Sequence, residues 1–376
     1  MSHRNCLIAA VLVWAAPLVV RAEDRLPTTA EVRSAAERAL PYLEREGLAW
    51  IKARNCSSCH TSTFNLWAHQ EARRKGLPVD EVKLAEWTAW VKGETRRRRD
   101  AFNLTKATLA ALPQQGVAVA VRDKLLPLQD KSHPTEQEFV AAIEGLLSPD
   151  ELAQHRAGLI AKATQKGDGG GLDNIHQLIL GGAPFAGQTP DSEWLAELVT
   201  ILSKWQQPSG SWKAAGQLPS TAEQNEITTA WTALALASLD TPGAETQQAL
   251  AAAAPEMKKM QPGKTNESLL TLLLWERRFG APDRAGKLQS ELEQRQNSDG
   301  GWGWVPGTPS DAFATGQALY ALSSCDLPAA DATIGRGRRY LLSTQTDDGS
   351  WTVPPEKISY STAPPRLKKL ETIYRY

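Results

Sequence analysis

The pattern Gln-x-x-x-Gly-x-Trp recurs in the second half of the chain and limits its fold more than any other feature. Three intact copies begin at Gln206, Gln296 and Gln345, and a degenerate copy without the tryptophan begins at Gln165. Successive copies lie 41, 90 and 49 residues apart, so the long interval fits two units with one signature lost. A recurring interval of this size indicates a repeated supersecondary unit.

Each copy ends an amphipathic helix, turns through glycine and is followed by another helix, as residues 312–322 follow the second copy. Two helices in each unit make a helical hairpin, and neighbouring hairpins bury a shared layer. Period-2 alternation is scarce, and runs such as 230–239 are rich in alanine and leucine, which disfavours β structure. The predicted class is all-α: a helical N-terminal segment followed by an α/α toroid, complete or incomplete, of helical hairpin repeats.

A second motif, Cys56-Ser57-Ser58-Cys59-His60, stands in the N-terminal half. C-x-x-C-H is the attachment signature of a c-type haem. The two thiols each take one haem vinyl group, and the imidazole becomes an axial ligand of the iron. The sequence therefore predicts heme c as cofactor, held by Cys56, Cys59 and His60.

Three alternatives to haem attachment exist for the cysteine pair: a redox pair, a zinc site and a disulfide. A thioredoxin-like redox pair stands near a βαβ pattern, and none is visible. Tetrahedral zinc needs four ligands, whereas no second cysteine pair exists and Cys325 and scattered histidines are all that remain. A plain Cys56–Cys59 disulfide in an oxidising compartment is the serious alternative.

The first residues resemble a secretory signal. Arg4 precedes the apolar run 6–20, and Val20-Arg21-Ala22 fits a small-x-small cleavage site. We predict a signal peptide over 1–22 and a periplasmic or secreted protein with no transmembrane span after cleavage; an uncleaved anchor is the alternative. Cys6 leaves with the peptide, and Cys325, at the end of an apolar helical run, is expected to be a small buried residue.

Residues 23–160 are predicted to form a helical cytochrome-c-like region, and residues 161–376 the repeat domain. A capping box of Thr28 and Glu31 predicts a helix that runs to the C-x-x-C-H motif. Two further helices are expected over 66–74 and 80–91.

Charge says little about partners, because Lys plus Arg and Asp plus Glu are both 42. A net charge of zero gives no general attraction to nucleic acid or acidic lipid, and we predict no nucleic-acid partner. The basic run Arg96 to Arg99 is expected on a solvated helix face, with a docking patch for an acidic redox partner or haem propionates as the sharper alternative.

The Gln…Gly-x-Trp copies resemble the QW repeats of squalene-hopene cyclases and the related prenyltransferase-type α/α barrels. The segment 310–322 is similar to inner-helix segments of that superfamily, and the resemblance covers roughly residues 160–376. It implies an α/α toroid. The chain stops at Tyr376 where a further inner helix is expected, so the ring is open, truncated or completed by a partner.

For activity the resemblance implies less. The cyclases protonate an alkene with an Asp-x-Asp-Asp motif ahead of Thr-Ala, whereas Thr229-Ala230 here is preceded by Asn225-Glu-Ile-Thr. Asp311 stands alone near an equivalent place; it is the weak catalytic candidate, and a helix N-cap is the favoured role. A zinc-dependent prenyltransferase needs a histidine ligand in the barrel, and none follows His176.

The chain also resembles exported bacterial proteins that join a cytochrome-c-like segment to a squalene-cyclase-type domain, for which no reaction is settled. Class I cytochromes c use a distal methionine. Weak distal candidates here are His69, His133, Met257 and Met260; His155 and His176 were also considered, and five-coordinate iron stays open.

Our first functional hypothesis is an exported haem-binding, electron-transfer protein whose toroid serves as scaffold or as docking surface for a redox partner protein. The second is a cyclase-superfamily enzyme, or a toroid that binds a lipid, polysaccharide or other small molecule, with C-x-x-C as a structural disulfide and an aromatic wall of Trp231, Trp275, Trp302 and Trp304. The third is a haem-free interaction module.

Overall fold

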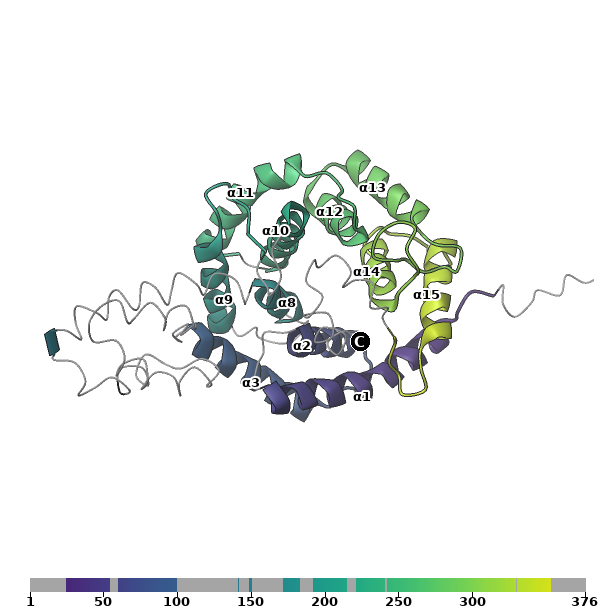
Figure 1. Cartoon of the computed structure of the whole chain (residues 1–376), viewed down its shortest axis with the longest axis horizontal. Coiled ribbons are helices and arrows are strands. Elements are labelled where there is room, and N and C mark those ends of the chain that lie inside the picture. The colour runs from purple at the N-terminus through teal and green to yellow at the C-terminus, as the bar shows by residue number, and fades with distance from the viewer. Residues whose placement is uncertain are drawn as a thin grey trace, which may run out of the picture.

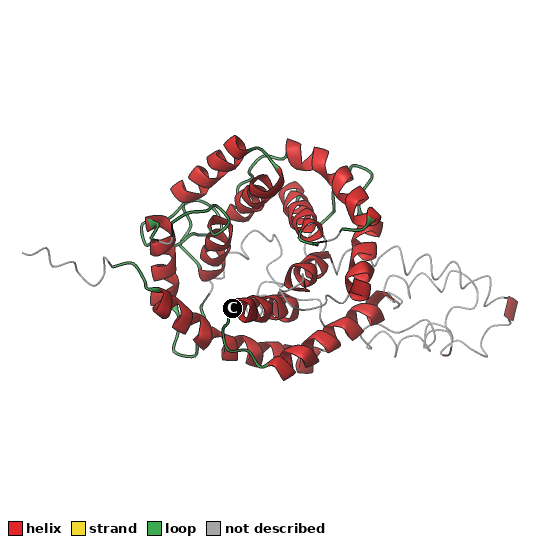
Figure 2. Ribbon diagram, turned by 180° about the vertical axis from the view of Figure 1, so that it is seen from behind, coloured by secondary structure: helices red, strands yellow, loops and turns green. Residues whose placement is uncertain are grey.

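The computed structural model describes residues 25–54, 60–99, 141, 149–150, 172–182, 192–214, 221–240, 242–328 and 330–352. These residues form eleven α-helices, with β pairing limited to isolated bridges, and Figure 2 shows helices joined by loops. The predicted all-α class is confirmed. The expected signal peptide, Cys56, Cys59, His133 and His155 lie outside the described residues.

The helices form an inner and an outer layer (Figure 1). Each inner helix packs against the next in the series: α2 (His60–Arg74), α8 (Leu172–Gly182), α10 (Ala222–Ala237), α12 (Asn266–Phe279) and α14 (Ala312–Leu322). The outer helices cover them: α1 (Thr29–Arg54), α3 (Glu81–Arg99), α9 (Ser192–Trp205), α11 (Ala244–Lys259), α13 (Pro282–Gln294) and α15 (Ala332–Thr344). Two helix pairs, α10–α11 and α12–α13, fill the interval between the first two intact motifs.

The N-terminal helices pack directly against helices of the repeat half. Helix α2 lies against α8, and α1 lies against α15. Aromatic pairs join α2 to α14: the rings of Phe64 and Phe313 are 6.1 Å apart, and those of Trp67 and Tyr320 are 5.8 Å apart. Aromatic side chains therefore connect the first and last inner helices of the described part of the chain. The division of the chain at residue 160 stays a prediction.

Several helices begin where the sequence indicated. The Thr28 N–H donates to the Glu31 carboxylate at 2.7 Å, and the Glu31 N–H donates to Thr28 Oγ1 at 3.3 Å, so the predicted capping box is confirmed. The bond from the Thr28 N–H, together with bonds to the same carboxylate from the Thr28 hydroxyl and from Arg25, lowers the pKa of Glu31 to about 2. The structure starts α2 at His60 and ends α3 at Arg99, so both helices are longer than the periodicity indicated.

The core lies between the two layers. In α10 nine consecutive residues, 228–236, are buried, and a helix that is buried all round must be apolar or small on every side. The alanines of α10 and α14 let helices approach closely, while large side chains such as Trp302, Leu198 and Leu269 are almost completely removed from water. Each such side chain contributes about 1.5–3 kcal/mol to folding.

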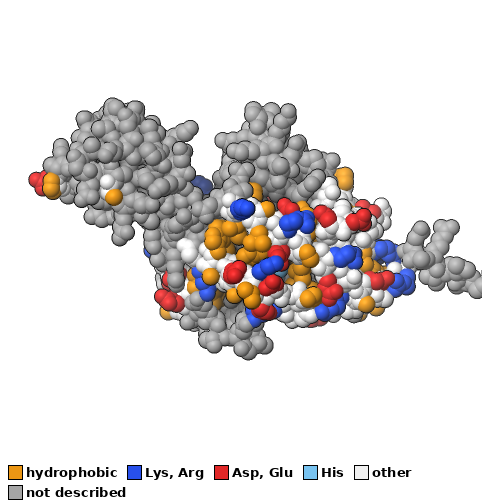
Figure 3. Space-filling model, turned by 90° about the horizontal axis from the view of Figure 1, so that it is seen from below, with side chains coloured by type: hydrophobic (Ala, Val, Ile, Leu, Met, Phe, Trp, Pro, Cys, Tyr) orange, Lys and Arg blue, Asp and Glu red, His pale blue; other side chains and the backbone are white. Residues whose placement is uncertain are grey.

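The outer surface carries charges of both signs. On the face shown in Figure 3, Lys and Arg side chains alternate with Asp and Glu around a patch of hydrophobic side chains. Among the described helices, none combines the length and the apolarity that a bilayer crossing requires.

Candidate functional site

The three Gln…Gly-x-Trp motifs make the same contacts at the turn that follows an outer helix. Each glutamine Nε2 donates to the glycine carbonyl of its own turn, at 2.9 Å for Gln206, 2.8 Å for Gln296 and 3.0 Å for Gln345. The same nitrogen donates to a carbonyl of the next outer helix. These second acceptors are Ala249 of α11 at 2.8 Å, Thr333 of α15 at 2.9 Å and Ala35 of α1 at 2.9 Å.

The motif glycines have positive φ and touch the same next helix. Their φ values are +91° at Gly210, +88° at Gly300 and +86° at Gly349. A Cβ added there would lie 1.9, 2.7 and 2.1 Å from the carbonyl oxygens of Ala252, Arg336 and Arg38, respectively. Glycine is required on both counts, by backbone conformation and by close approach.

The motif tryptophans anchor the turn to the helix that precedes it. The Nε1 atoms of Trp212, Trp302 and Trp351 donate to the carbonyls ten residues earlier, each at 2.8 Å. The backbone N–H groups of Trp212 and Trp302 donate to threonines of the next inner helix, Thr229 and Thr315, each at 2.9 Å. The repeated residues are therefore structural, since they tie each turn to the helices around it.

These contacts give α1 the same place beside the third motif that α15 has beside the second. Arg336 of α15 donates to the Gln296 side chain from Nε at 2.9 Å, and Arg38 of α1 donates to the Gln345 side chain at 2.6 Å. In both helices the carbonyl that accepts from glutamine lies three residues before the arginine. The first outer helix in sequence thus receives the last motif.

The C-x-x-C-H motif occupies the connection from an outer helix to an inner one. Helix α1 ends at Arg54, and α2 begins at His60, so the motif residues span the same kind of connection that carries the tryptophan motifs elsewhere. Residues 55–59 and the His60 side chain are outside the described residues.

Aromatic side chains surround the next turns of α2. The rings of Phe64 and Trp67 stack at 6.1 Å, and Trp67 meets Trp231 of α10 edge to face at 6.2 Å. Trp231 Nε1 donates to Glu267 of α12 at 3.1 Å, and Gln317 of α14 donates to the same carboxylate oxygen at 3.1 Å. These rings give the first turns of α2 an apolar surrounding, with the Glu267 carboxylate beside Trp231.

His176, one of the histidines considered above as a distal ligand, is buried in the inner layer. It lies on α8 with 5% of its surface exposed, and its ring stacks on Trp231 at 6.2 Å with an interplanar angle of 21°. Its Nδ1 has no hydrogen-bond partner among the described residues. Burial lowers its pKa to about 3. A histidine on an apolar helix face gave no signal in the sequence that separated it from the others.

The other candidates for the distal ligand lie elsewhere. His69 is buried between α2 and α3, where its Nδ1 is 2.8 Å from the Asn65 carbonyl and its ring meets Trp87 edge to face at 5.0 Å. Burial lowers the pKa of His69. Met257 and Met260 are buried at the end of α11, which lies on the side of the molecule away from α2 (Figure 1). His133 is outside the described residues.

Asp311 has the capping role that the sequence favoured. It is the N-cap of α14, and its Oδ1 accepts the Ala314 N–H at 2.8 Å. Of the expected aromatic wall, Trp231 faces other aromatic rings of the inner helices. Trp302 is fully buried in its motif turn, and Trp275 packs on Phe279 at 4.8 Å.

Cys325 is buried with 7% of its surface exposed, and its Sγ lies 3.6 Å from the Ala321 carbonyl oxygen. Burial raises its pKa, and the expectation that Cys325 is a small buried residue is confirmed. No group of three or more His, Cys, Asp or Glu side chains suited to a metal ion occurs within the described ranges.

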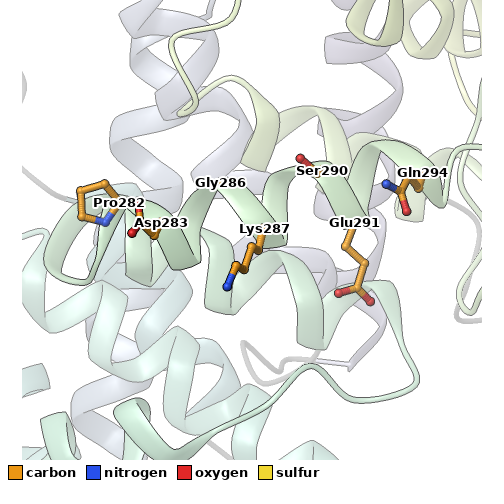
Figure 4. Close-up of a pocket in the computed structure, with 7 residues that line it drawn as sticks. All are labelled: Pro282, Asp283, Gly286, Lys287, Ser290, Glu291 and Gln294. Carbon is orange, nitrogen blue, oxygen red and sulfur yellow. The ribbon is translucent and has the colours of Figure 1, made fainter.

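A surface pocket lies on α13 (Figure 4). All seven lining residues belong to that single outer helix, including Asp283, Lys287 and Glu291. No candidate site residue lines it, and one exposed helix face does not assemble groups from several elements as a binding site does.

Comparison with protein-family models and with curated protein sequences found no match to this chain.

Proposed function

We propose that this chain is an exported c-type haem protein that transfers electrons. Cys56 and Cys59 hold the porphyrin through thioether bonds, and His60 is an axial ligand of the iron. The observation that carries the proposal is the place of the motif: C-x-x-C-H ends on the first residue of an inner helix, and the next turns of that helix contact aromatic rings of α10 and α14.

The haem supplies one-electron chemistry when it is bound, and the protein residues position it. The half-buried rings of Phe64, Trp67 and Phe313 lie against one another near the start of α2. The burial of a haem and the polarity around it are among the factors that set its reduction potential. The apolar run 6–20 supports export, which brings the cysteines to the compartment where haem is attached.

The scaffold in this proposal is a closed α/α toroid of the kind that squalene-hopene cyclases have. Two observations support it: α1 receives the third motif as α15 receives the second, and aromatic pairs join α2 to α14. In such a ring the two halves of the chain form one body, and its outer surface is available to a redox partner protein.

The test is to export the full chain from a bacterial host that has haem-attachment machinery, and to compare it with Cys59→Ala. We expect wild-type protein with a sharp reduced-haem absorption band and a mass increased by one covalent haem. The variant should lose the stable two-point attachment and most of the colour.

The alternative readings give different results in the same experiment. A structural disulfide leaves wild-type protein colourless, with a mass lower than the reduced chain by two hydrogens. Bound lipid or another small molecule extracted from colourless protein would instead favour the toroid as a ligand-binding or enzymatic cavity. Either outcome would remove the redox proposal.

A further inference from the structure

Helices α14 and α2 are neighbours in the inner layer whose backbones do not pack closely. The other neighbouring pairs of described inner helices, α2–α8, α8–α10, α10–α12 and α12–α14, bring their backbones together, and α14–α2 is not among these closely packed pairs. Aromatic side chains connect α14 to α2 instead, Phe313 to Phe64 at 6.1 Å and Tyr320 to Trp67 at 5.8 Å. We call these four residues the α14–α2 seam.

The seam carries apolar surface that the described helices leave partly uncovered. Tyr320 is 41% exposed, and the other three rings are half-buried. The outer layer is continuous at the same place, because α15 contacts α1 and the third motif binds the Ala35 carbonyl. The described part of the chain therefore has six outer helices and five inner ones (Figure 1).

The repeat shows where an inner helix follows a motif. Helix α10 begins ten residues after Trp212 and packs on α8, the inner helix before it. Helix α14 begins ten residues after Trp302 and packs on α12. The same spacing after Trp351 puts the start of an inner helix at position 361, with α14 as the helix on which it packs. The face of α14 that carries the seam rings is the one toward α2.

The sequence after position 360 has the length and pattern of such a helix. It supplies sixteen residues, and α10, α12 and α14 contain 16, 14 and 11 residues. Pro365 suits a first helical turn. Leu367, Leu370 and Tyr374 recur at the spacing that places apolar side chains on one face of a helix.

The charge of this segment also matches the seam. Gln317 lies on the same face of α14 as the seam rings, and it donates to the Glu267 carboxylate at 3.1 Å, so an acidic group stands beside the seam. The segment has four basic side chains and a single acidic one, namely Arg366, Lys368, Lys369, Arg375 and Glu371. Opposite charges across a contact favour the correct pairing.

We infer that residues 361–376 form a helix that packs on the α14–α2 seam and supplies a sixth inner helix. The apolar face of Leu367, Leu370 and Tyr374 covers the seam rings, and burial of this surface is the main source of stabilisation. The seam is then a binding surface for the chain's own C-terminal segment and not for an outside partner. The inference does not depend on the haem.

The experiment measures hydrogen exchange by mass spectrometry in the full chain and in two full-length variants. Leu370→Asp puts a charge on the apolar face of the segment, and Thr372→Asp is the matched control on the opposite face. In wild type we expect the amides of residues 369–376 to exchange more slowly than those of an unstructured chain, by about tenfold or more. Leu370→Asp should lose this protection and speed exchange in the parts of α14 and α2 that carry the seam rings, whereas Thr372→Asp should change neither.

Three results would overturn the inference. In the first, residues 369–376 of wild type exchange as fast as an unstructured chain. In the second, the segment is protected but Leu370→Asp leaves α14 and α2 unchanged, so the segment packs elsewhere. In the third, the protection appears only at high protein concentration, which assigns the seam to a second copy of the chain. The Cys59→Ala variant should show the wild-type pattern, so failure of the haem proposal leaves this inference standing.

Discussion

Buried polar groups are hydrogen-bonded in the motif turns, whereas one in the inner layer has no partner among the described residues. In the turns, each glutamine amide and each tryptophan Nε1 donates to a carbonyl at 2.8–3.0 Å. Near the start of α2, the His176 Nδ1 is buried with no partner among the described residues. Fully satisfied polar groups hold a fold together, while an unsatisfied one marks a place where the fold alone does not explain the residue.

The largest loss of stability should come from removing a tryptophan of the motif turns. We expect Trp302→Ala to lower the free energy of unfolding by about 3–5 kcal/mol, because it removes a fully buried indole and leaves the Leu292 carbonyl unpaired. Denaturant titration of the full chain measures it. Trp351 makes the equivalent bond from a half-buried position, so Trp351→Ala should cost less. Equal costs would contradict the role assigned to burial.

Substitution of a motif glycine should give the next largest loss of stability. Gly349→Ala places a Cβ 2.1 Å from the Arg38 carbonyl oxygen at a φ of +86°, so strain and overpacking together should cost about 2–5 kcal/mol. Gly307 has a φ of +81° with nothing within 4 Å and is the matched control for strain alone. Thermal or chemical unfolding of both variants should show the larger loss at Gly349, and a larger loss at Gly307 would break the comparison.

Because the His176 Nδ1 is buried without a partner among the described residues, we expect the stability of haem-free protein to depend on pH. The Cys59→Ala variant supplies haem-free protein for this test. The folded pKa of His176 is about 3, below the ordinary value of 6.5, so between these values the unfolded chain binds a proton that the folded chain does not. Stability should therefore fall as pH falls from 6.5 to 4.5, by about 2–3 kcal/mol from this group.

Denaturant titrations at several pH values measure that slope, and His176→Leu should remove it. His69→Leu is the comparison, because the pKa of His69 is also lowered by burial. An unchanged slope in His176→Leu would show that another group is responsible.

The contact between the third motif and α1 predicts the smallest loss of stability. Gln345→Ala removes the bond to the Ala35 carbonyl and should cost about 1–3 kcal/mol. Gln296→Ala removes the equivalent bond to Thr333 and serves as the matched control. Hydrogen exchange should show α1 less protected in the first variant alone, and protection of α1 that does not change would mean that the third motif does not hold it.

The sequence predicted the parts of this molecule that local patterns encode. The capping box of Thr28 and Glu31, the N-cap at Asp311 and the buried Cys325 all follow from a residue and its near neighbours, and the structure confirms them. The pairing of Gln345 with α1 was not predicted, because its acceptor is a backbone carbonyl at Ala35, which any residue type supplies.

The candidate site was less accessible to sequence reasoning. The C-x-x-C-H motif is local and was found, whereas the burial of the His176 Nδ1 without a partner among the described residues depends on three-dimensional packing. Residue type and spacing do not encode that property, so the sequence did not separate His176 from the other histidines.

The most direct test of the central claim is a crystal structure of the exported, full-length protein with data collected at the iron absorption edge. We expect a single strong anomalous iron peak at the start of α2, with His60 bonded to the iron and Cys56 and Cys59 bonded to the porphyrin. A map with no iron peak and with those two sulfurs joined to each other would contradict it.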